Sequence, residues 1–521
     1  MSGSGDGRAE RLFAGWSANL LQLLLGITQQ VGLVPVFLHY RSSEMLAAWL
    51  ALYAAGNLVL VADVGLQSRA INRFLAFKSC VDSDGRTAGY YSGMRRVYFA
   101  LTGLLIASVL AGTFLLHPAS ALGFQAIPNF DASLAVMVAG MLCVLPSNLA
   151  AGLYRARGLY GRAVWMQCAA MLVAQLGQLV AIMTAGSLTM ISIAYVMPQI
   201  VAAGYLTIID VRRLFPFLHY PRAGQRSSWH WSRRWSWHWT SGQFRRAFPF
   251  AVAGGTEVAL QNLPMLLVSA LVADRVAVAQ WGLTRVVAGL VRALCLQATL
   301  PLAAELGHDH AIGARQRMRR LYARGSVFVA LLASVVVSGF LAFWPDFFAL
   351  WTQCVIAYDP VLTLTLLIGA EIVAPAMLAL GFAYYSDRGE LLARTKGLQL
   401  ASFLVLSLVL TPRMGALGTA IALVATDLLV QFGLLALTVI RQTLQRPIRH
   451  VVFLALLMAL VTAFGWALGL AISSVVSRTV SWTGLPRFVA ECILWLAVMA
   501  LATAPLQNGR LRDRLTDMIP S

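Results

Sequence analysis

Two arginines lie inside one apolar stretch of the chain, where charged side chains are rare. Arg285 and Arg292 are seven residues apart in segment 277–299, so in a helix they share a face and lie about 10 Å apart along its axis. A charge at this depth in an apolar segment costs roughly 2.5–3.5 kcal/mol on insertion scales and therefore needs a partner. Because guanidinium groups match the oxygens of phosphates, we interpret the pair as ligands of an anionic group.

A pair of buried salt bridges is the alternative for these arginines. Segment 277–299 contains no acidic residue, and the carboxylates available in other apolar segments are Glu257 and Glu371. Gln261 follows Glu257 by one turn, and Pro375 follows Glu371 by one turn and frees a backbone carbonyl. The same two glutamates could therefore hold a coupling ion, Na⁺ or H⁺. The sequence leaves these alternatives open.

The first apolar segment carries a polar stripe. Gly15, Asn19, Gln22, Gly26 and Gln29 recur every three or four residues, which places them on one face of a helix. This pattern predicts a wet face that contacts a polar ligand. Hydrogen bonds between helices and close packing of small residues would produce the same pattern.

The elements that carry these residues are membrane-spanning helices. Of the 521 residues, 59% are apolar and 12% are charged, a composition that a soluble domain of this length does not have. A helix of about 20 residues crosses a hydrocarbon core of roughly 30 Å, and the chain contains about fourteen such segments. They lie near 15–38, 46–66, 97–116, 133–154, 164–185, 189–209, 248–271, 277–299, 326–345, 361–384, 397–411, 416–440, 451–473 and 488–505.

Positive charge is concentrated in every second gap between these segments. The arginine-rich gaps are the N-terminus, 69–96, 155–162, 212–246, 315–324, 388–396, 441–449 and the C-terminal tail. The positive-inside rule predicts that these gaps, and with them both termini, are cytoplasmic. The net charge of +19 then faces anionic lipid headgroups, so we predict membrane lipids rather than nucleic acid as partners.

The domain organisation follows from the longest polar stretch. We predict an N-terminal lobe of six helices at 1–212, a linker at 213–246, a C-terminal lobe of six helices at 247–441, and a final part at 442–521 with two helices and a cytoplasmic tail. Within the linker, residues 227–241 read SSWHWSRRWSWHWTS. Indole and guanidinium groups favour the headgroup layer, so we interpret this insert as an interfacial linker, with a surface for anionic lipid or a partner protein as the alternative.

The remaining motifs predict neither an enzyme nor a metal site or cofactor. The six cysteines have no paired spacing, and His308-Asp309-His310 has no third ligand at a fixed distance, so we expect that tripeptide in a solvated loop. The chain has no nucleotide-binding loop of the Walker type. The predicted external loops contain no cluster of acid, base and nucleophile.

Three stretches are similar to one transporter family. They are ANLLQLLLG at 18–26, VADVGLQSRAINRFLA at 61–76 and LQATLPLAAELG at 296–307. In this order, on a plan of fourteen helices, the chain resembles the Wzx-type polysaccharide flippases of the multidrug/oligosaccharidyl-lipid/polysaccharide (MOP) exporter superfamily.

This resemblance implies two six-helix lobes, as in MATE transporters, around a V-shaped cation-lined cavity, plus two C-terminal helices. It implies that a polyprenyl (undecaprenyl) pyrophosphate-linked oligosaccharide crosses the bacterial inner membrane for envelope polysaccharide biosynthesis, with other assembly proteins as partners. Arg285 and Arg292 would hold the pyrophosphate or acidic sugars, and Asn19, Gln22 and Gln29 would contact the glycan.

Drug exporters of the same superfamily give the alternative function. In a Na⁺- or H⁺-coupled multidrug exporter of the MATE type, Glu257 and Glu371 would hold the coupling ion. The two arginines favour the flippase, because they repel a cationic drug and attract an anionic headgroup.

Overall fold

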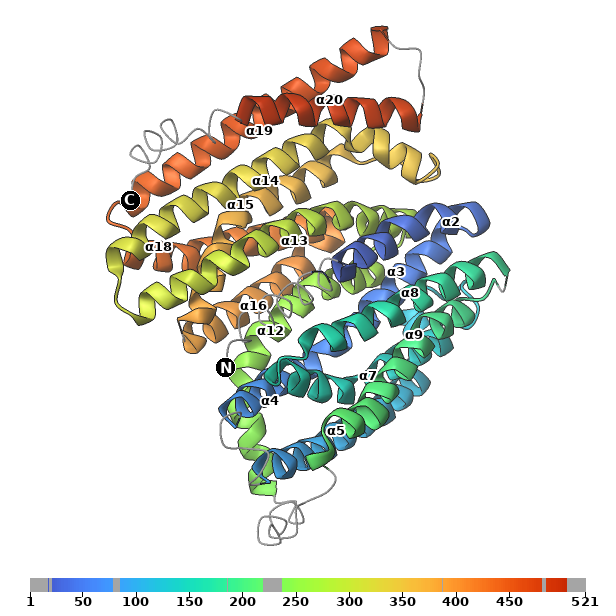
Figure 1. Cartoon of the computed structure of the whole chain (residues 1–521). Helices are drawn as coiled ribbons and strands as arrows, with labels where there is room; N and C mark the ends of the chain where they lie inside the picture. The colour runs from blue at the N-terminus through green and yellow to red at the C-terminus, as the bar shows by residue number, and fades with distance from the viewer. Residues whose placement is uncertain are drawn as a thin grey trace. The chain divides into compact units, whose positions relative to one another are not determined.

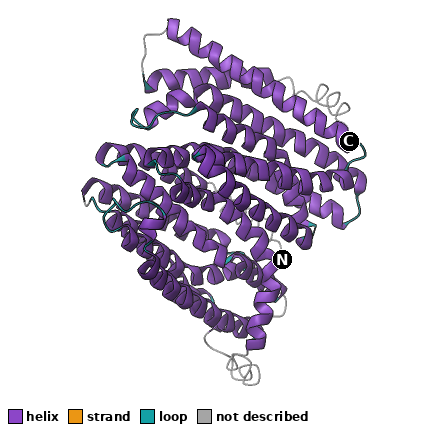
Figure 2. Ribbon diagram, turned by 180° about the vertical axis from the view of Figure 1, so that it is seen from behind, coloured by secondary structure: helices purple, strands orange, loops and turns teal. Residues whose placement is uncertain are grey.

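The computed structural model describes residues 17, 21–77, 85–184, 186–218, 237–386, 388–479 and 484–503, and these residues form helices joined by short connections (Figure 2). The predicted all-α fold is confirmed. Twelve helices in the described ranges are long and apolar enough to cross a membrane. The other two predicted segments correspond to α12 (Trp237–Leu271) and α20 (Leu485–Thr503), so a plan of about fourteen spans describes the chain.

The chain divides into two compact units, Met1–Ala273 and Asp274–Ser521. The first unit begins with the helical span Leu21–Tyr40, which contains η1 (Thr28–Gly32) and α2 (Leu33–Tyr40). It continues with α3 (Ser43–Leu58), η2 (Val59–Ala62), α4 (Val64–Ala76), α5 (Arg86–Leu116), α6 (Pro118–Ala121), α7 (Phe130–Ala156), α8 (Tyr160–Thr184), α9 (Leu188–Gly204), η3 (Tyr205–Asp210), α10 (Val211–Leu214), η4 (Pro216–Leu218) and α12.

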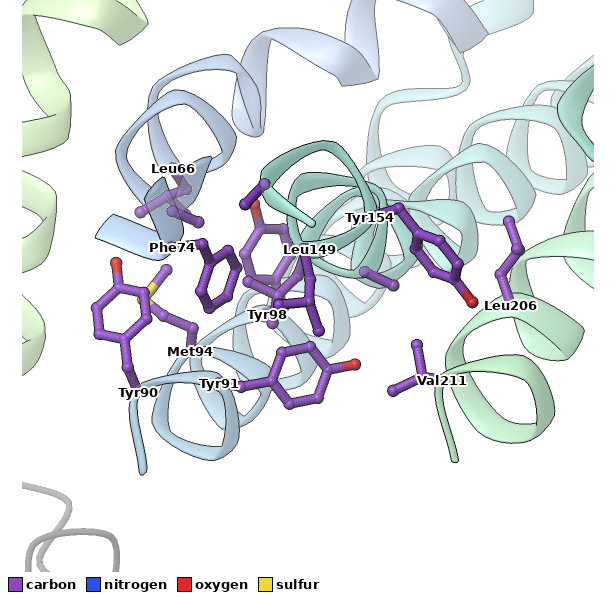
Figure 3. Packing of buried hydrophobic residues seen from close by; sticks show 14 of the residues in the cluster. Leu66, Phe74, Tyr90, Tyr91, Met94, Tyr98, Leu149, Tyr154, Leu206 and Val211 are labelled. Atoms are coloured by element: carbon purple, nitrogen blue, oxygen red, sulfur yellow. The ribbon is translucent and has the colours of Figure 1, made fainter. Parts of the chain in front are cut away.

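An aromatic cluster forms much of the core of the first unit. Phe74 of α4, Tyr90, Tyr91 and Tyr98 of α5 and Tyr154 of α7 are buried together with aliphatic side chains (Figure 3). The ring of Tyr90 meets that of Phe74 edge-on, with the centroids 5.6 Å apart, which is a favourable geometry for aromatic pairs. This cluster joins α4, α5 and α7 into one packed layer.

Helix α12 belongs to the first unit, although the sequence assigned 247–271 to the C-terminal lobe. It begins at Trp237, inside the predicted linker, and packs along α3 and α4 (Figure 1). At the crossing with α4, a Cβ added to Gly65 would lie 2.6 Å from Ala251 Cβ. Because glycine and alanine allow the two backbones to approach closely, α12 is joined to the first unit, and the units divide after Ala273.

The second unit contains the remaining helices. They are α13 (Arg275–Ala311), α14 (Arg315–Trp351), α15 (Pro360–Tyr385), α16 (Gly389–Met414), α17 (Ala416–Thr426), η5 (Asp427–Ala436), α18 (Leu437–Thr443), α19 (Pro447–Thr479) and α20. Helix α15 packs against α13 and α14, and α14 packs against α19 (Figure 1). Helix α20 lies on α14 and α19, where Trp495 Nε1 donates to Gly465 O at 3.0 Å. The last two long helices are therefore part of this unit.

Acidic and hydroxyl side chains fix where several helices begin. The carboxylate of Asp274 accepts from Val276 N at 2.9 Å at the start of α13, and that of Asp359 accepts from Val361 N at 2.9 Å at the start of α15. Ser42 caps α3 in the same way. Such caps satisfy backbone N–H groups that the helix itself leaves unpaired.

A cationic network in the second unit is the candidate functional site

Arg292 of α13 forms an ion pair with Asp427, the first residue of η5. The carboxylate partner is buried, with 1% of its side chain exposed, whereas the Arg292 side chain is 29% exposed. A salt bridge was one of the predicted alternatives for Arg292, and it is present. Its carboxylate is Asp427, however, and not Glu257 or Glu371.

The ion pair continues into a buried chain of polar side chains. Gln399 Nε2 donates to Asp427 Oδ1 at 2.6 Å. Lys396 Nζ donates to Gln399 Oε1 and to Gln431 Oε1, both at 2.9 Å. Lys396 and Gln399 are one turn apart on α16, and Asp427 and Gln431 lie on the π-helical stretch η5. The network therefore connects α13, α16 and η5.

Lys396 corrects one feature of the predicted topology. The sequence placed it in the arginine-rich cytoplasmic gap 388–396, but α16 already begins at Gly389. Lys396 is only 1% exposed. Burying an ammonium group is costly unless acceptors replace its water, and the two glutamine carbonyls supply them. The spacing of Lys396 and Gln399, one helical turn, is the signal in the sequence that could have identified this pair.

Arg285 adds a third cation on the face of α13 that carries Arg292. Its guanidinium carbon lies 5.6 Å from the ring centre of Trp281, which is fully buried, a geometry that stabilises the cation by interaction with the indole face. We define the cationic network as Arg285, Arg292, Lys396 and Asp427 with Gln399 and Gln431. Guanidinium and ammonium groups of this kind can bind anionic oxygens.

The predicted polar face of the first helix is used, at least in part, for contacts within the first unit. Gln29 Nε2 donates to Gln178 Oε1 of α8 at 2.7 Å, and both residues are buried. One turn before Gln178, Gln175 Nε2 donates to Leu25 O at 2.6 Å. These are the interhelical hydrogen bonds that the sequence left as an alternative. Gln22 is half-buried, and Asn19 lies outside the described residues.

The two glutamates proposed for a coupling ion lie in different units. Glu371 of α15 is 3% exposed and accepts from Ser334 Oγ of α14 at 2.8 Å and from Thr462 Oγ1 of α19 at 2.5 Å. Glu257 is half-buried in α12 of the first unit. Glu371 is therefore held by hydroxyl groups from two neighbouring helices. A coupling-ion site that contains both glutamates stays a prediction.

Two aspartates of the first unit have partners that the sequence did not predict. The carboxylate of Asp63 accepts from Tyr98 Oη and Asn148 Nδ2, although Arg69 and Arg73 follow it closely in the sequence. Asp210, which no sequence pattern singled out, is fully buried and pairs with Arg162, whose Nη2 lies 2.7 Å from Asp210 Oδ1. Both carboxylates hold helices of the first unit together.

The His308-Asp309-His310 tripeptide is helical and not part of a solvated loop. It lies in the last turns of α13, and the fully buried Asp309 is 3.4 Å from Arg317 Nε of α14. In the described ranges, no group of three or more His, Cys, Asp or Glu residues could hold a metal ion. The tripeptide therefore contributes to packing between α13 and α14.

Comparison with known proteins supports the fold. No family model and no curated protein matches the chain. Among solved structures, the lipid II flippase MurJ in an inward closed conformation has a TM-score of 0.67 at 11% identity and covers 95% of this chain and 99% of its own. An inward-facing multidrug resistance MATE family transporter of the MOP superfamily has a TM-score of 0.52 at 14% identity and covers 84% of this chain and 98% of its own. A mutant of the Vibrio cholerae MATE transporter VcmN has the same score and coverage at 16% identity.

These likenesses define a class of protein by its fold. The chain is a multi-pass, all-helical membrane protein with the fold of a flippase and of MATE transporters. The structures that it resembles are transporters and flippases rather than enzymes. The finer resemblance to Wzx-type flippases rests on the sequence stretches alone.

Proposed function

We propose that this protein is a flippase that moves a polyprenyl pyrophosphate-linked oligosaccharide from the cytoplasmic to the periplasmic leaflet of a bacterial inner membrane. Transport would proceed by alternating access and would serve envelope polysaccharide biosynthesis. The observation that carries this proposal is the position of Arg292, whose partly exposed guanidinium pairs with the buried Asp427 in a network with Lys396, while Arg285 lies on the same face of α13. A diphosphate crosses hydrocarbon only if fixed donors replace its water.

Arg292 is the residue best placed to exchange partners. Its carboxylate partner is buried, while part of the guanidinium is exposed, so a phosphate can approach it without entering the packed interior. Asp427 keeps the hydrogen bond from Gln399 when Arg292 turns to a ligand. Lys396 Nζ donates to Gln399 Oε1 and so holds in place the amide that donates to Asp427 in that state. In this proposal, Arg292 alternates between Asp427 and the pyrophosphate.

The other predicted contacts have separate roles. Arg285 would bind the second phosphate or an acidic sugar from its position about 10 Å along α13. Asn19 and Gln22 would contact the glycan, and Gln29 would orient this helix through Gln178. The polyprenyl tail can remain in the bilayer throughout, because only the polar headgroup needs a path through protein.

A Na⁺- or H⁺-coupled multidrug exporter of the MATE type is the second candidate, and Glu371 favours it. Its buried carboxylate accepts hydrogen bonds from two neutral hydroxyls, an environment in which a proton or a small cation could neutralise the charge. The two candidate functions differ in the sign of the charge on the transported group, which is negative for the flippase and positive for the drug exporter. They can therefore be separated by substrate and by variant.

The test is a transport assay on the full chain in vesicles, with a fluorescent polyprenyl pyrophosphate-linked oligosaccharide in one series and a cationic dye in the other. The flippase proposal predicts translocation of the lipid, lost in Arg285→Gln and Arg292→Gln. The control is Arg394→Gln, because Arg394 is exposed and its ion pair is with the exposed Glu390, one turn away on the same helix. Transport of the dye alone, lost in Glu371→Gln but kept in the arginine variants, would establish the exporter instead.

A further inference from the structure

Three arginines gather where α4 meets α12 in the first unit. Arg69 and Arg73 are one turn apart on α4, and Arg246 of α12 is near enough for its charge to act on Arg69. Burial, together with the charges of Arg73 and Arg246, lowers the pKa of the Arg69 guanidinium. Like charges held this close repel each other, so this arrangement favours an anion between them.

The donors in this cluster are incompletely satisfied. Arg69 Nε and Arg73 Nε are buried and have no hydrogen-bond partner in the described part of the chain, and the same is true of Tyr90 Oη. Figure 3 shows Tyr90 at the edge of the aromatic cluster, with its hydroxyl directed away from Phe74 and Tyr91. Asp63, a nearby carboxylate in the sequence, is already bound by Tyr98 and Asn148. Buried donors without partners are costly, and an incoming anion would satisfy them.

An apolar groove of about 330 Å³ opens at the same helix pair. Ala62 and Leu66 line it from η2 and α4, and Phe244, Phe248 and Ala251 line it from α12. Phe244 and Phe248 are 40% and 66% exposed, so the groove is an open, aromatic-edged surface. Arg245 also lines it, which places a fourth cation at its border.

Along α4, the apolar groove and the arginines follow one another in the order of the acyl chain and the headgroup of a phospholipid. Gly65 lies against Ala251, and Gly255 lies against Val61, so α4 and α12 run antiparallel. Moving along α4 from the groove residue Leu66 therefore leads to Arg69 and then to Arg73, toward the arginine-rich gaps predicted to be cytoplasmic. In this register Phe248 and Phe244 lie at about the level of Arg69 and Arg73, and the groove extends from there past Leu66 and Ala251 to Ala62, away from the arginines.

We propose that the α4–α12 junction binds one anionic phospholipid of the surrounding bilayer, with its phosphate held by Arg69, Arg73 and Arg246 and an acyl chain that passes Phe248 and Leu66. This lipid would be resident, and it would occupy the first unit, whereas the cationic network lies in the second. The proposal depends on charge complementarity and on the groove, and it holds whether the transported substrate is a glycolipid or a drug.

The test is a titration of the delipidated full chain in detergent with phosphatidylglycerol, read by native mass spectrometry. Phosphatidylcholine serves as the neutral comparison and should bind at least roughly tenfold more weakly. Arg69→Gln/Arg73→Gln should weaken binding of phosphatidylglycerol roughly thirtyfold, since each basic residue near anionic lipid contributes about fivefold. The matched control is Arg315→Gln/Arg320→Gln, which removes the same charge from two exposed residues of α14.

A second variant distinguishes a lipid from a free phosphate and leaves the three arginines unchanged. Phe248→Ala should weaken binding of phosphatidylglycerol several-fold and leave the affinity for inorganic phosphate unchanged, so that phosphate displaces the lipid at a lower concentration. An equal loss of phosphatidylglycerol binding in Arg69→Gln/Arg73→Gln and in Arg315→Gln/Arg320→Gln would overturn the site, because it would show only a general attraction of anionic lipid to basic surface residues. The lipid assignment would be overturned by two results together: Phe248→Ala binds phosphatidylglycerol as the parent chain does, and inorganic phosphate competes at the same concentration as the lipid. These results would show a phosphate site.

Discussion

The ion pair between Arg292 and Asp427 predicts unequal effects of removing its two partners. Arg292→Gln leaves a carboxylate that is 1% exposed with Gln399 Nε2 as its remaining side-chain donor. Asp427→Asn leaves a guanidinium that is 29% exposed and can turn toward water or headgroups. Because an uncompensated buried charge costs far more than an exposed one, the arginine variant should be the less stable.

The size of the difference follows from these exposures. Breaking a buried ion pair lowers the free energy of unfolding by about 3–5 kcal/mol. Because the hydrogen bond from Gln399 to Asp427 survives, Arg292→Gln should cost about 3 kcal/mol, the lower end of this range. Asp427→Asn should cost about 1–2 kcal/mol, the value of a lost charge-assisted hydrogen bond. In the double variant the two amides can bond to each other, so its cost should be about 2 kcal/mol and fall below the sum.

The assay combines stability with transport. The free energy of unfolding would be measured by denaturant titration in detergent for the parent chain, both single variants and the double variant. Lipid translocation would be measured in vesicles for the same four chains. If Arg292 binds the transported headgroup, the double variant should regain stability relative to Arg292→Gln but remain inactive.

Two results would refute this reasoning. Additive costs in the double variant would show that Arg292 and Asp427 do not interact as described. A stable double variant with normal translocation would show that Arg292 serves only to neutralise Asp427, and the role of Arg292 in substrate binding would be abandoned.

Three further predictions concern packing, a second ion pair and the insert. Gly140→Val should lower the free energy of unfolding of the first unit, measured by thermal denaturation, by about 1–3 kcal/mol, because a side chain there would meet Val196. Gly112 has open space at its Cβ, so Gly112→Val should cost less than about 0.5 kcal/mol. Arg162→Gln should cost about 3 kcal/mol in denaturant unfolding, because it removes the only cation paired with the fully buried Asp210 in the described part of the chain. A cost below about 1 kcal/mol would contradict the burial of the Asp210 carboxylate. Residues 227–236 of the insert lie outside the described residues, whereas 237–241 form the first turn of α12. Deletion of 227–236 should leave vesicle transport largely intact if the insert is a linker, and loss of transport would favour a binding surface.

The fold could be predicted from the sequence because the bilayer restricts the choices. Apolar segments long enough to cross it must satisfy their own backbone, which only helices and closed barrels do. The position of α12 could not be predicted in the same way. Its assignment to the first unit depends on Gly65 meeting Ala251, and a close contact between residues this far apart in the chain leaves no pattern in either segment.

The candidate site was only partly predictable. The shared face of Arg285 and Arg292 follows from helical periodicity within one segment. Asp427 was missed as a partner because it is 135 residues from Arg292 and lies on a π-helix, whose wider turn shifts the face that a side chain occupies. Lys396 was misplaced because a lysine next to arginines resembles a loop, although α16 begins seven residues before it.

The most direct test of the central claim is to deplete the protein in its host, extract the lipids and determine on which side of the inner membrane the glycan of the polyprenyl pyrophosphate-linked oligosaccharide lies. Our account predicts that this lipid accumulates with its glycan on the cytoplasmic side, and that the parent chain relieves the accumulation but Arg285→Gln and Arg292→Gln do not. A normal amount and distribution of the lipid-linked glycan, together with altered tolerance of cationic drugs, would contradict the account.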